Sequence, residues 1–280
     1  MTTLPAPGPT RVQIGPLWID QVDFPGALEI IERLIDAGGG GAVFTPNVDH
    51  VVVADRHPAF LAAYNRADLS LVDGQPLVWA ARLLGVPLPA KISGADLLLP
   101  LMKLAARRKL RVYLIGGPPG VGEEAAAKLQ RDLGVEVVGV ESPIIPLAAS
   151  PIDEALAARV AAARPHLLLA FLGAPKGELF IDRVRDRVAP AVAVQLGASL
   201  DFYLGRVKRA PRWMQRLGLE WLFRLSQEPR RLARRYLVED PKFLAILWRT
   251  FRTPRADRVR AAQSAYPLSP TRDRTNRQAP

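Results

Sequence analysis

Short apolar runs alternate with amphipathic stretches from residue 11 to residue 205. The first segment, 11–23, has two short apolar runs around Gly15 and Pro16, which predicts a two-stranded hairpin. Further runs of strand length, each followed by a turn, lie within 42–47, 68–74, 110–120, 135–143, 166–178 and 191–202. Apolar residues at helical spacing predict helices within 24–38, 48–67, 75–85, 95–109, 121–134, 151–165 and 179–188.

This alternation predicts the fold class. It is typical of an α/β domain with a Rossmann-like, doubly wound, mostly parallel sheet. Several predicted strands are continuous apolar runs, as expected where helices cover both faces of a sheet. After residue 205 no further strand is predicted, and the chain becomes basic and helical. We therefore predict a disordered tail (1–10), an α/β catalytic domain (11–205), a basic helical appendage (206–261) and a second disordered tail (262–280).

The positive charge is concentrated in the last quarter of the chain. The formal net charge is +11, and residues 206–280 hold 19 of the 38 Lys and Arg residues but only 6 of the 27 Asp and Glu residues. Such asymmetry points to a polyanionic partner: nucleic acid, anionic lipid or a diphosphate. Within 218–237, "GLEWLFRLSQEPRRLARRYL", bulky apolar side chains stand among the cations. At this point a nucleic-acid arm, a membrane-binding surface and part of an active site all remain open.

The sequence argues against two classes of protein: those that depend on cysteine and those that span a membrane. Cysteine is absent, so neither disulfides nor thiolate chemistry can occur, which fits a reducing cytoplasm. The first 15 residues lack the apolar core of a signal peptide, and no run approaches the roughly 18 apolar residues that a spanning helix needs. We therefore expect a protein that is soluble or peripheral to a membrane.

Candidate chemistry lies at the carboxyl ends of the predicted strands, where open α/β sheets bind their ligands. Asp73 follows an apolar run and precedes Gly74. Partial desolvation there would raise the pKa of its carboxyl group and make it a usable general base. An ordinary turn or helix-capping aspartate is the alternative, and the local sequence favours it. Thr45 and Asn47 can hydrogen-bond a ligand hydroxyl, or merely cap the next helix.

Other polar positions give weaker signals. The glycine-rich turn 116–120 resembles a phosphate cradle, but it lacks both the P-loop and the GxGxxG pattern, and a plain tight turn fits equally well. Lys176 can contact a phosphate or be a solvated surface lysine. His50, His57 and His166 do not combine with acidic residues at metal-ligand spacing, so we predict no metal site and no cofactor.

Four motifs occur in order along the chain. They are T-P-N at 45–47, A-D-L-S-L-V-D-G at 67–74, F-L-G-A-P-K-G-E at 171–178 and the long K-R-A-P-R-W-M-Q-R-L-G-L-E-W-L-F-R-L-S-Q-E-P-R-R-L-A-R-R at 208–235. Together they resemble the WecG/TagA/CpsF family of bacterial glycosyltransferases over roughly residues 12–250. The last motif is long enough to make a chance match implausible.

The resemblance implies an inverting, metal-independent glycosyltransferase. It would move a sugar from a nucleotide-sugar donor, usually a UDP-sugar, to a polyprenyl-diphosphate-linked acceptor in exopolysaccharide or cell-wall polymer biosynthesis. The family's general base corresponds to Asp73, which would deprotonate the acceptor hydroxyl. The T-P-N turn would line the same pocket, so Thr45 and Asn47 are expected substrate contacts.

The resemblance also implies that arginines of the C-terminal segment bind the diphosphate. The family pattern places these arginines at Arg224, Arg231 and Arg234. On one straight helix, Arg231 and Arg235 would each lie about 20° from Arg224, and Arg234 would lie about 60° from Arg231. Pro229 predicts two helices instead. Guanidinium groups beside the leaving diphosphate would stabilise the transition state without a metal.

Two positions depart from the family pattern. Lys91, an expected substrate contact, stands where many members have arginine, and lysine keeps the charge without the bidentate fork. Gly177 stands where the family usually has a glutamine that contacts substrate. That contact is therefore missing here or supplied elsewhere. Neither change removes the proposed base.

The C-terminal segment also predicts where the protein acts. Trp, Leu and Phe among cations indicate an anionic membrane surface as partner, and hence a cytoplasmic protein peripheral on the inner face of the cell membrane. The resemblance is compatible with a homo-oligomer. Two alternatives remain: a nucleic-acid-binding protein that uses the basic segment, and another nucleotide-binding Rossmann-like enzyme. We expect no nucleic-acid partner because no nucleic-acid motif is present. The sequence does not identify the sugar or the acceptor glycan.

Overall fold

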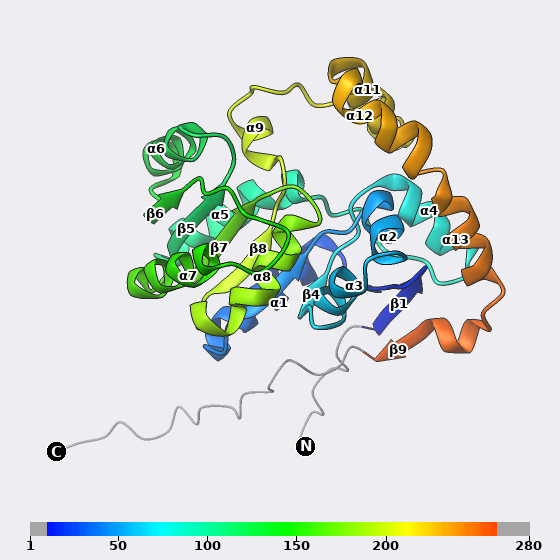
Figure 1. The fold of residues 1–280 in the computed structure, drawn as a ribbon, viewed down its shortest axis with the longest axis horizontal. Coiled ribbons are helices and arrows are strands. Elements are labelled where there is room, and N and C mark those ends of the chain that lie inside the picture. Colours follow the sequence, from blue (N-terminus) through cyan, green and yellow to red (C-terminus); the bar gives the residue numbers. More distant parts are fainter. Residues whose placement is uncertain (1–9, 262–280) are drawn as a thin grey trace.

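The computed structural model describes residues 10–261, and its centre is a six-stranded parallel sheet in the order β4-β3-β8-β7-β5-β6 (Figure 1). The strands are β3 Gly41–Phe44, β4 Leu69–Ser70, β5 Arg111–Gly116, β6 Glu136–Glu141, β7 Leu167–Phe171 and β8 Val192–Gln195. The central strands β7 and β8 are buried along their whole length, so both faces of the sheet are covered. The predicted Rossmann-like, doubly wound fold is confirmed.

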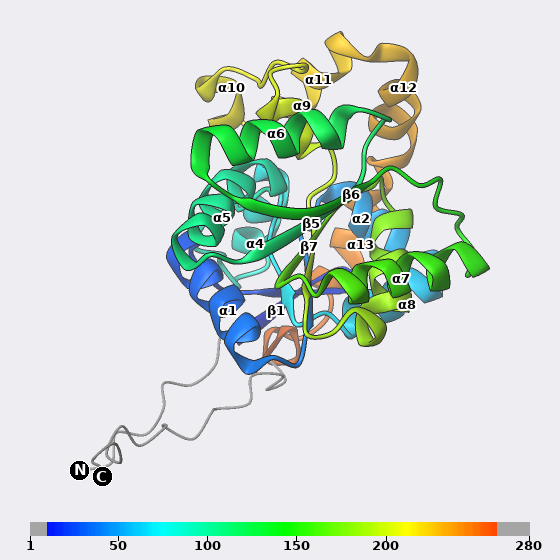
Figure 2. The same ribbon diagram turned by 90° about the vertical axis from the view of Figure 1, so that its left-hand side faces the viewer.

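Helices pack on both faces because side chains alternate along each strand. In β5, Val112 and Leu114 enter one apolar cluster, and Tyr113 and Ile115 enter the other. The first cluster includes side chains of α1 Phe24–Ala37, α5 Gly94–Arg108, α6 Val121–Leu133 and α9 Ser199–Tyr203. The second includes those of α2 Val48–Ala54, α3 Pro58–Asn65, α4 Gln75–Leu83, α7 Pro151–Ala163 and α8 Lys176–Val188. Figure 2 shows α1, α5 and α6 on one face and α7 and α8 on the other.

The stretch 48–67, predicted as one helix, contains two. α2 ends at Ala54, and α3 begins at Pro58, where the backbone N–H of Phe60 donates to His57 Nδ1 at 3.2 Å. Proline is favoured at a helix start because the N–H it lacks would have no partner within the helix. A proline thus marks a boundary that apolar spacing alone does not show.

A small antiparallel sheet joins the two ends of the described chain. β1 Thr10–Ile14 and β2 Leu17–Asp20 form the predicted hairpin, and β9 Val259–Ala261 pairs with the other edge of β1. The expectation that no strand follows residue 205 is therefore wrong. β9 is too short and too polar to show a strand pattern, and Arg260 of this strand lies over the Trp18 ring at 4.0 Å.

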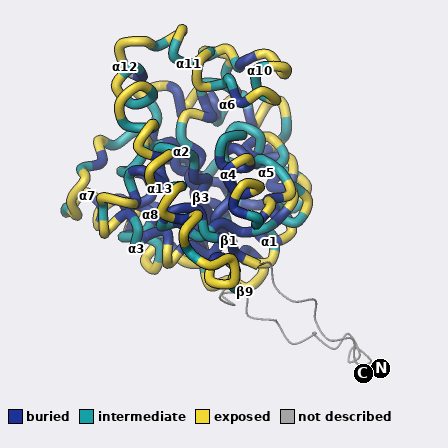
Figure 3. Tube along the Cα trace, turned by 90° about the vertical axis from the view of Figure 1, so that its right-hand side faces the viewer, coloured by how far each residue is buried: buried dark blue, intermediate teal, exposed yellow. Residues whose placement is uncertain are grey.

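The segment between α9 and β9 forms an arm along one side of the molecule (Figure 1). It contains α10 Arg212–Arg216, α11 Glu220–Gln227, α12 Pro229–Arg234, a π-helical turn Arg235–Glu239, α13 Lys242–Phe251 and a 3₁₀ turn Arg255–Arg258. Pro229 begins α12, so the predicted division at this proline is confirmed. Among the described side chains of α10, α11 and α12 only Leu232 is buried, and these helices are largely exposed in Figure 3.

Candidate active site

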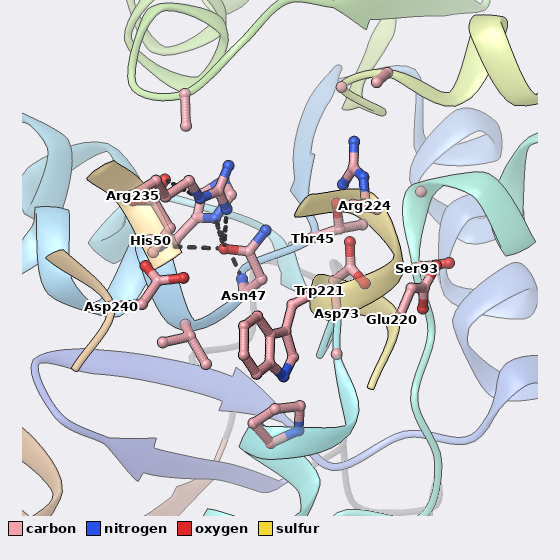
Figure 4. A pocket seen from close by; sticks show the side chains of 18 of the residues that line it. Thr45, Asn47, His50, Asp73, Ser93, Glu220, Trp221, Arg224, Arg235 and Asp240 are labelled. Atoms are coloured by element: carbon pink, nitrogen blue, oxygen red, sulfur yellow. Dashed lines mark hydrogen bonds and ion pairs between the residues drawn. The ribbon is translucent and has the colours of Figure 1, made fainter. Parts of the chain in front are cut away.

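A cavity of about 560 Å³ opens where β3, β4, β7 and β8 end, between the sheet and the C-terminal arm (Figure 4). Ligands of open α/β sheets bind at this edge. Polar side chains from the turns and helices after these strands line one side: Thr45, Asn47, His50, Asp73, Ser93 and Glu178. The C-terminal arm lines the other side with Gln215, Glu220, Trp221, Arg224, Arg235, Tyr236 and Asp240.

Asp73 is held beside the T-P-N turn by the backbone. Its N–H donates to the carbonyl of Pro46 at 2.7 Å, which joins the turn after β4 to the turn after β3. Gly74 follows with φ of +106°, a conformation that residues with a side chain rarely adopt. The Asp-Gly pair thus lets the chain turn sharply at the strand end and leaves the carboxylate in the cavity, together with Thr45 and Asn47.

The carboxyl group of Asp73 is partly buried, and loss of water around it raises its pKa to about 6. The positive charge of Lys91 opposes this increase, and the negative charge of Glu220 adds to it. With a pKa of about 6 the group is mostly ionised at pH 7, yet it takes up a proton more readily than an exposed aspartate. These are the properties of a general base.

Asn47 caps the next helix, which is one of the two roles that the sequence leaves open, and it also lines the cavity. Its side-chain oxygen accepts the N–H of His50 at 3.4 Å and so caps α2. The same oxygen accepts a hydrogen bond from Arg235 Nη2 at 3.2 Å, in the cavity. Thr45 Oγ1 donates to the carbonyl of Gln195 at 3.4 Å and ties β3 to β8.

The arginines of the C-terminal arm do not all reach the cavity. Arg224 lines it, with its guanidinium over the Phe202 ring at 5.6 Å and its Nε buried without a hydrogen-bond partner among the described residues. Arg234 points away: 86% of its side chain is exposed, and its Nε lies 3.9 Å from Glu239. The side chain of Arg231, the third predicted diphosphate ligand, lies outside the described part of the structure.

Arg235, which we did not predict, occupies the cavity instead. Besides its hydrogen bond to Asn47, its Nε lies 3.5 Å from Asp49 Oδ2, and its guanidinium stands over the Tyr236 ring at 5.5 Å. One signal in the sequence did favour it, since straight-helix geometry places it on the face of Arg224. The family pattern favoured the neighbouring residue, Arg234, as the diphosphate ligand.

Lys91 is not among the residues that line the cavity. Its Nζ lies 3.6 Å from Asp96 and 3.5 Å from Glu220, while Arg209 reaches the same two carboxylates at 2.7 Å and 3.8 Å. Glu220 belongs to α11 and Asp96 to α5. The two cations and two carboxylates therefore connect the C-terminal arm to the α/β domain beside Asp73.

Three further titratable residues line the cavity that sequence reasoning missed. His50 Nε2 lies 3.0 Å from Glu178 Oε1, and the other oxygen of Glu178 is buried without a hydrogen-bond partner among the described residues. Burial raises the pKa of Asp240 to about 6, and the nearby positive charge of Arg235 opposes this increase. His50 and Glu178 stand within or next to the quoted motifs, so their positions were visible although their roles were not.

The remaining candidates lie elsewhere. The glycine turn 116–120 does not line the cavity, and a Cβ at Gly116 would stand 2.7 Å from the carbonyl oxygen of Phe171. That glycine thus permits close packing of two strand ends. Lys176 is also not among the lining residues.

Within residues 10–261 no group of three or more His, Asp or Glu side chains is arranged to hold a metal ion. The same residues contain no helix with the length and apolar character needed to span a bilayer.

Comparison with known proteins finds a matching family and a large number of related proteins. The family described as glycosyl transferase WecG/TagA/CpsF matches residues 12–257. The N-acetylglucosaminyldiphosphoundecaprenol N-acetyl-beta-D-mannosaminyltransferase of Bacillus spizizenii is 33% identical over 211 residues, which cover 75% of this chain and 79% of that protein. Among solved structures, unliganded arylmalonate decarboxylase matches with a TM-score of 0.23 and 15% identity over 61% of this chain and 94% of its own.

The family match spans the α/β domain and the C-terminal arm together, and hence both sides of the cavity that contains Asp73, Arg224 and Arg235. The chain belongs to the WecG/TagA/CpsF family and is a glycosyltransferase.

Proposed function

We propose that the protein transfers N-acetylmannosamine, or a closely related sugar, from a UDP-sugar to N-acetylglucosamine on a polyprenyl diphosphate. The observation that carries this proposal is the placement of a carboxyl group with a raised pKa, Asp73, in one cavity with two guanidinium groups, Arg224 and Arg235. The choice of sugar and acceptor is supported by the activity for which the Bacillus relative is named. A role in cell-wall or exopolysaccharide synthesis follows from such an acceptor.

Asp73 supplies the base in the proposed reaction. Its carboxylate accepts the proton of the acceptor hydroxyl, and the oxygen so exposed attacks C1 of the donor sugar. The bond between C1 and the diphosphate oxygen breaks, and UDP leaves with the bonding electron pair. Attack opposite to the leaving group inverts the configuration at C1. General-base assistance of this kind typically contributes about 10²–10⁴-fold to a rate.

The arginines stabilise the leaving group in this mechanism. Negative charge grows on the diphosphate as its bond to C1 breaks, and a guanidinium group that is already in place binds that charge without reorganisation. Arg235 is held by Asn47 and Asp49, so its position is set before substrate arrives. Thr45 and Asn47 remain proposed substrate contacts. Arg224 is the second proposed diphosphate ligand, and Lys91 acts on the pKa of Asp73 and on the position of α11.

We further propose that the C-terminal arm binds an anionic membrane surface, where a polyprenyl acceptor resides. Leu244, Trp248 and Phe251 stand at helical spacing on one side of α13 and are 68%, 64% and 50% exposed. Phe243 and Ile246, on the opposite side, are buried in the core. An amphipathic helix with exposed aromatic groups among cations is typical of interfacial binding.

The proposed reaction is tested with the purified full-length protein. UDP-N-acetylmannosamine and a short-chain polyprenyl diphosphate carrying N-acetylglucosamine are incubated with it, and UDP and the lipid-linked disaccharide are measured by mass spectrometry. We expect both products in equal amounts, with a β configuration at the new bond. A panel of UDP- and GDP-sugars identifies the preferred donor. Absence of transfer from every donor in the panel would contradict the proposal.

A further inference from the structure

Gln195 is a buried polar residue of the cavity with one unused hydrogen-bonding atom. It ends β8, is only 3% exposed and contributes to the cavity lining. Its Nε2 donates to the carbonyl of Leu172 at 2.7 Å, which fixes the orientation of the amide. Its Oε1 is buried and has no hydrogen-bond partner among the described residues. An acceptor buried without a partner destabilises a fold, so its presence in a cavity suggests that a ligand satisfies it.

The neighbouring Gly177 provides the space that this amide occupies. A Cβ built on Gly177 would lie 1.8 Å from Gln195 Nε2, 2.4 Å from Cδ and 2.7 Å from Oε1. Gly177 lies in the first turn of α8 without a positive φ, so its backbone conformation does not require glycine. Glycine in a helix is less favourable than alanine. The compensating feature in the structure is the room it leaves for Gln195.

We propose that Gln195 is a substrate-binding residue, whose Oε1 accepts a hydrogen bond from a hydroxyl or amide N–H of the bound sugar. Because Leu172 engages the N–H₂ side of the amide, the carbonyl side is left for the ligand and selects a hydrogen-bond donor. Gly177 and Gln195 act as a pair, since any side chain at position 177 displaces the amide. The inference rests on the proposed sugar transfer. It also explains how a chain with glycine at position 177 can still present an amide to substrate.

Thr45 strengthens this placement. Its hydroxyl donates to the backbone carbonyl of Gln195, so the two residues are neighbours at the ends of β3 and β8. Thr45 is itself a proposed substrate contact. A sugar that reached Thr45 would therefore lie close to the amide of Gln195.

The test measures kcat/KM for sugar transfer, UDP affinity and Tm for four variants: Gln195→Met, Gln195→Ala, Gly177→Ala and the double variant Gly177→Ala/Gln195→Ala. Methionine keeps the length of the side chain and removes its hydrogen bonds. We expect Gln195→Met to lower kcat/KM about tenfold or more, as for the loss of one hydrogen bond in the transition state, with UDP affinity retained. Gly177→Ala should be at least as damaging, because the new methyl group displaces the amide. The double variant should be no worse than Gln195→Ala, since the clash is gone.

Gln130→Met on the exposed surface of α6 and Gly39→Ala, whose Cβ would meet nothing within 4 Å, are the matched controls. Unchanged kcat/KM in Gln195→Met overturns the inference, and so do additive losses in the double variant. Loss of UDP affinity in Gln195→Met would assign the residue to the nucleotide and overturn its role toward the sugar. A loss of activity that merely follows a fall in Tm would show a structural role only. A wild-type protein without transferase activity would overturn the proposed function itself, which is a distinct outcome.

Discussion

The α/β domain and the C-terminal arm bury their apolar side chains to very different extents. The strands and helices before residue 206 form two clusters on the two faces of one sheet. Residues 206–261 are less than a quarter of the described chain, yet they carry 10 of its 16 exposed large apolar side chains. The domain is thus stabilised by its own core. The arm is attached through Phe243, Ile246, β9 and a set of ion pairs, and it leaves apolar and cationic groups free for other contacts.

This difference matches a division of labour at the cavity. The α/β domain holds Asp73 between two strand-end turns, whereas the arm supplies Arg224 and Arg235 from the opposite side. The proposed base requires accurate placement, while the proposed anion-binding groups lie in the arm, whose helix α13 carries the proposed membrane-binding surface. The predictions below test each side of this division in turn.

The largest effect is expected on the side of the domain. Asp73→Asn removes the base and keeps the size of the side chain, so kcat should fall by about 10²–10⁴-fold while UDP binding persists. Initial rates of disaccharide formation and UDP-induced shifts in Tm measure the two properties. Turnover near that of the wild type would show that Asp73 is not the base.

The stability of this variant provides a control for misfolding. Burial raises the pKa of Asp73 in the folded protein, so its ionised form destabilises the fold at pH values above about 6. Asparagine has no such charge. The variant should therefore melt at the same temperature as the wild type or higher at pH 7.5, and the difference should vanish below the unfolded pKa of 3.8. A marked fall in Tm would attribute the lost activity to misfolding.

A smaller effect is expected on the side of the arm, where two adjacent arginines offer a matched pair. Arg235→Ala removes a guanidinium that lines the cavity, and Arg234→Ala removes one that is 86% exposed. Loss of a hydrogen bond to a charged group corresponds to about 1.5–3 kcal/mol, so kcat/KM should fall roughly 10- to 100-fold for Arg235→Ala. Arg234→Ala should change it by less than about threefold. Equal losses in the two variants, or a greater loss in Arg234→Ala, would contradict the assignment.

The smallest effect on catalysis, and the clearest on location, should come from the outer side of α13. Replacing Trp248 and Phe251 with serine removes exposed apolar groups that neither belong to the core nor line the cavity. Flotation with vesicles of phosphatidylglycerol should show at least about tenfold weaker binding, because each buried side chain of this size contributes on the order of 1.5–3 kcal/mol. Activity on a detergent-dispersed, short-chain acceptor should persist. Unchanged vesicle binding would contradict the membrane proposal.

The sequence predicted the domain better than the arm for a physical reason. Apolar periodicity reports burial, and nearly every strand and helix of the domain is half or wholly buried. The ends of strands β3 and β4 could therefore be located, and with them Thr45, Asn47 and Asp73. In the arm the helices are short and broken at Pro229 and at the π-helical turn, so helical spacing does not fix which way a side chain points. That is why the straight-helix geometry, which favoured Arg235, could not by itself outweigh the family pattern, which favoured Arg234.

Contacts between distant segments were the second source of error. β9 lies at the edge of β1 although more than 240 residues separate them, and its three residues carry no pattern of their own. Gln195 and Gly177 show the same limit. Gly177 departs from the family pattern and Gln195 belongs to no quoted motif, and only the fold shows that one occupies the space that the other leaves.

The pH dependence of kcat/KM tests the central claim most directly, because this quantity reports the pKa of the base in the free enzyme. With a pKa of about 6 for Asp73, kcat/KM of the wild type should be constant above pH 7 and should fall about tenfold per pH unit below pH 6. Melting curves at each pH would confirm that the protein stays folded, and the Asp73→Asn variant should lose this acidic limb. A wild-type profile that stays flat between pH 7 and pH 5, or an acidic limb that survives in Asp73→Asn, would contradict the claim that Asp73 is the general base.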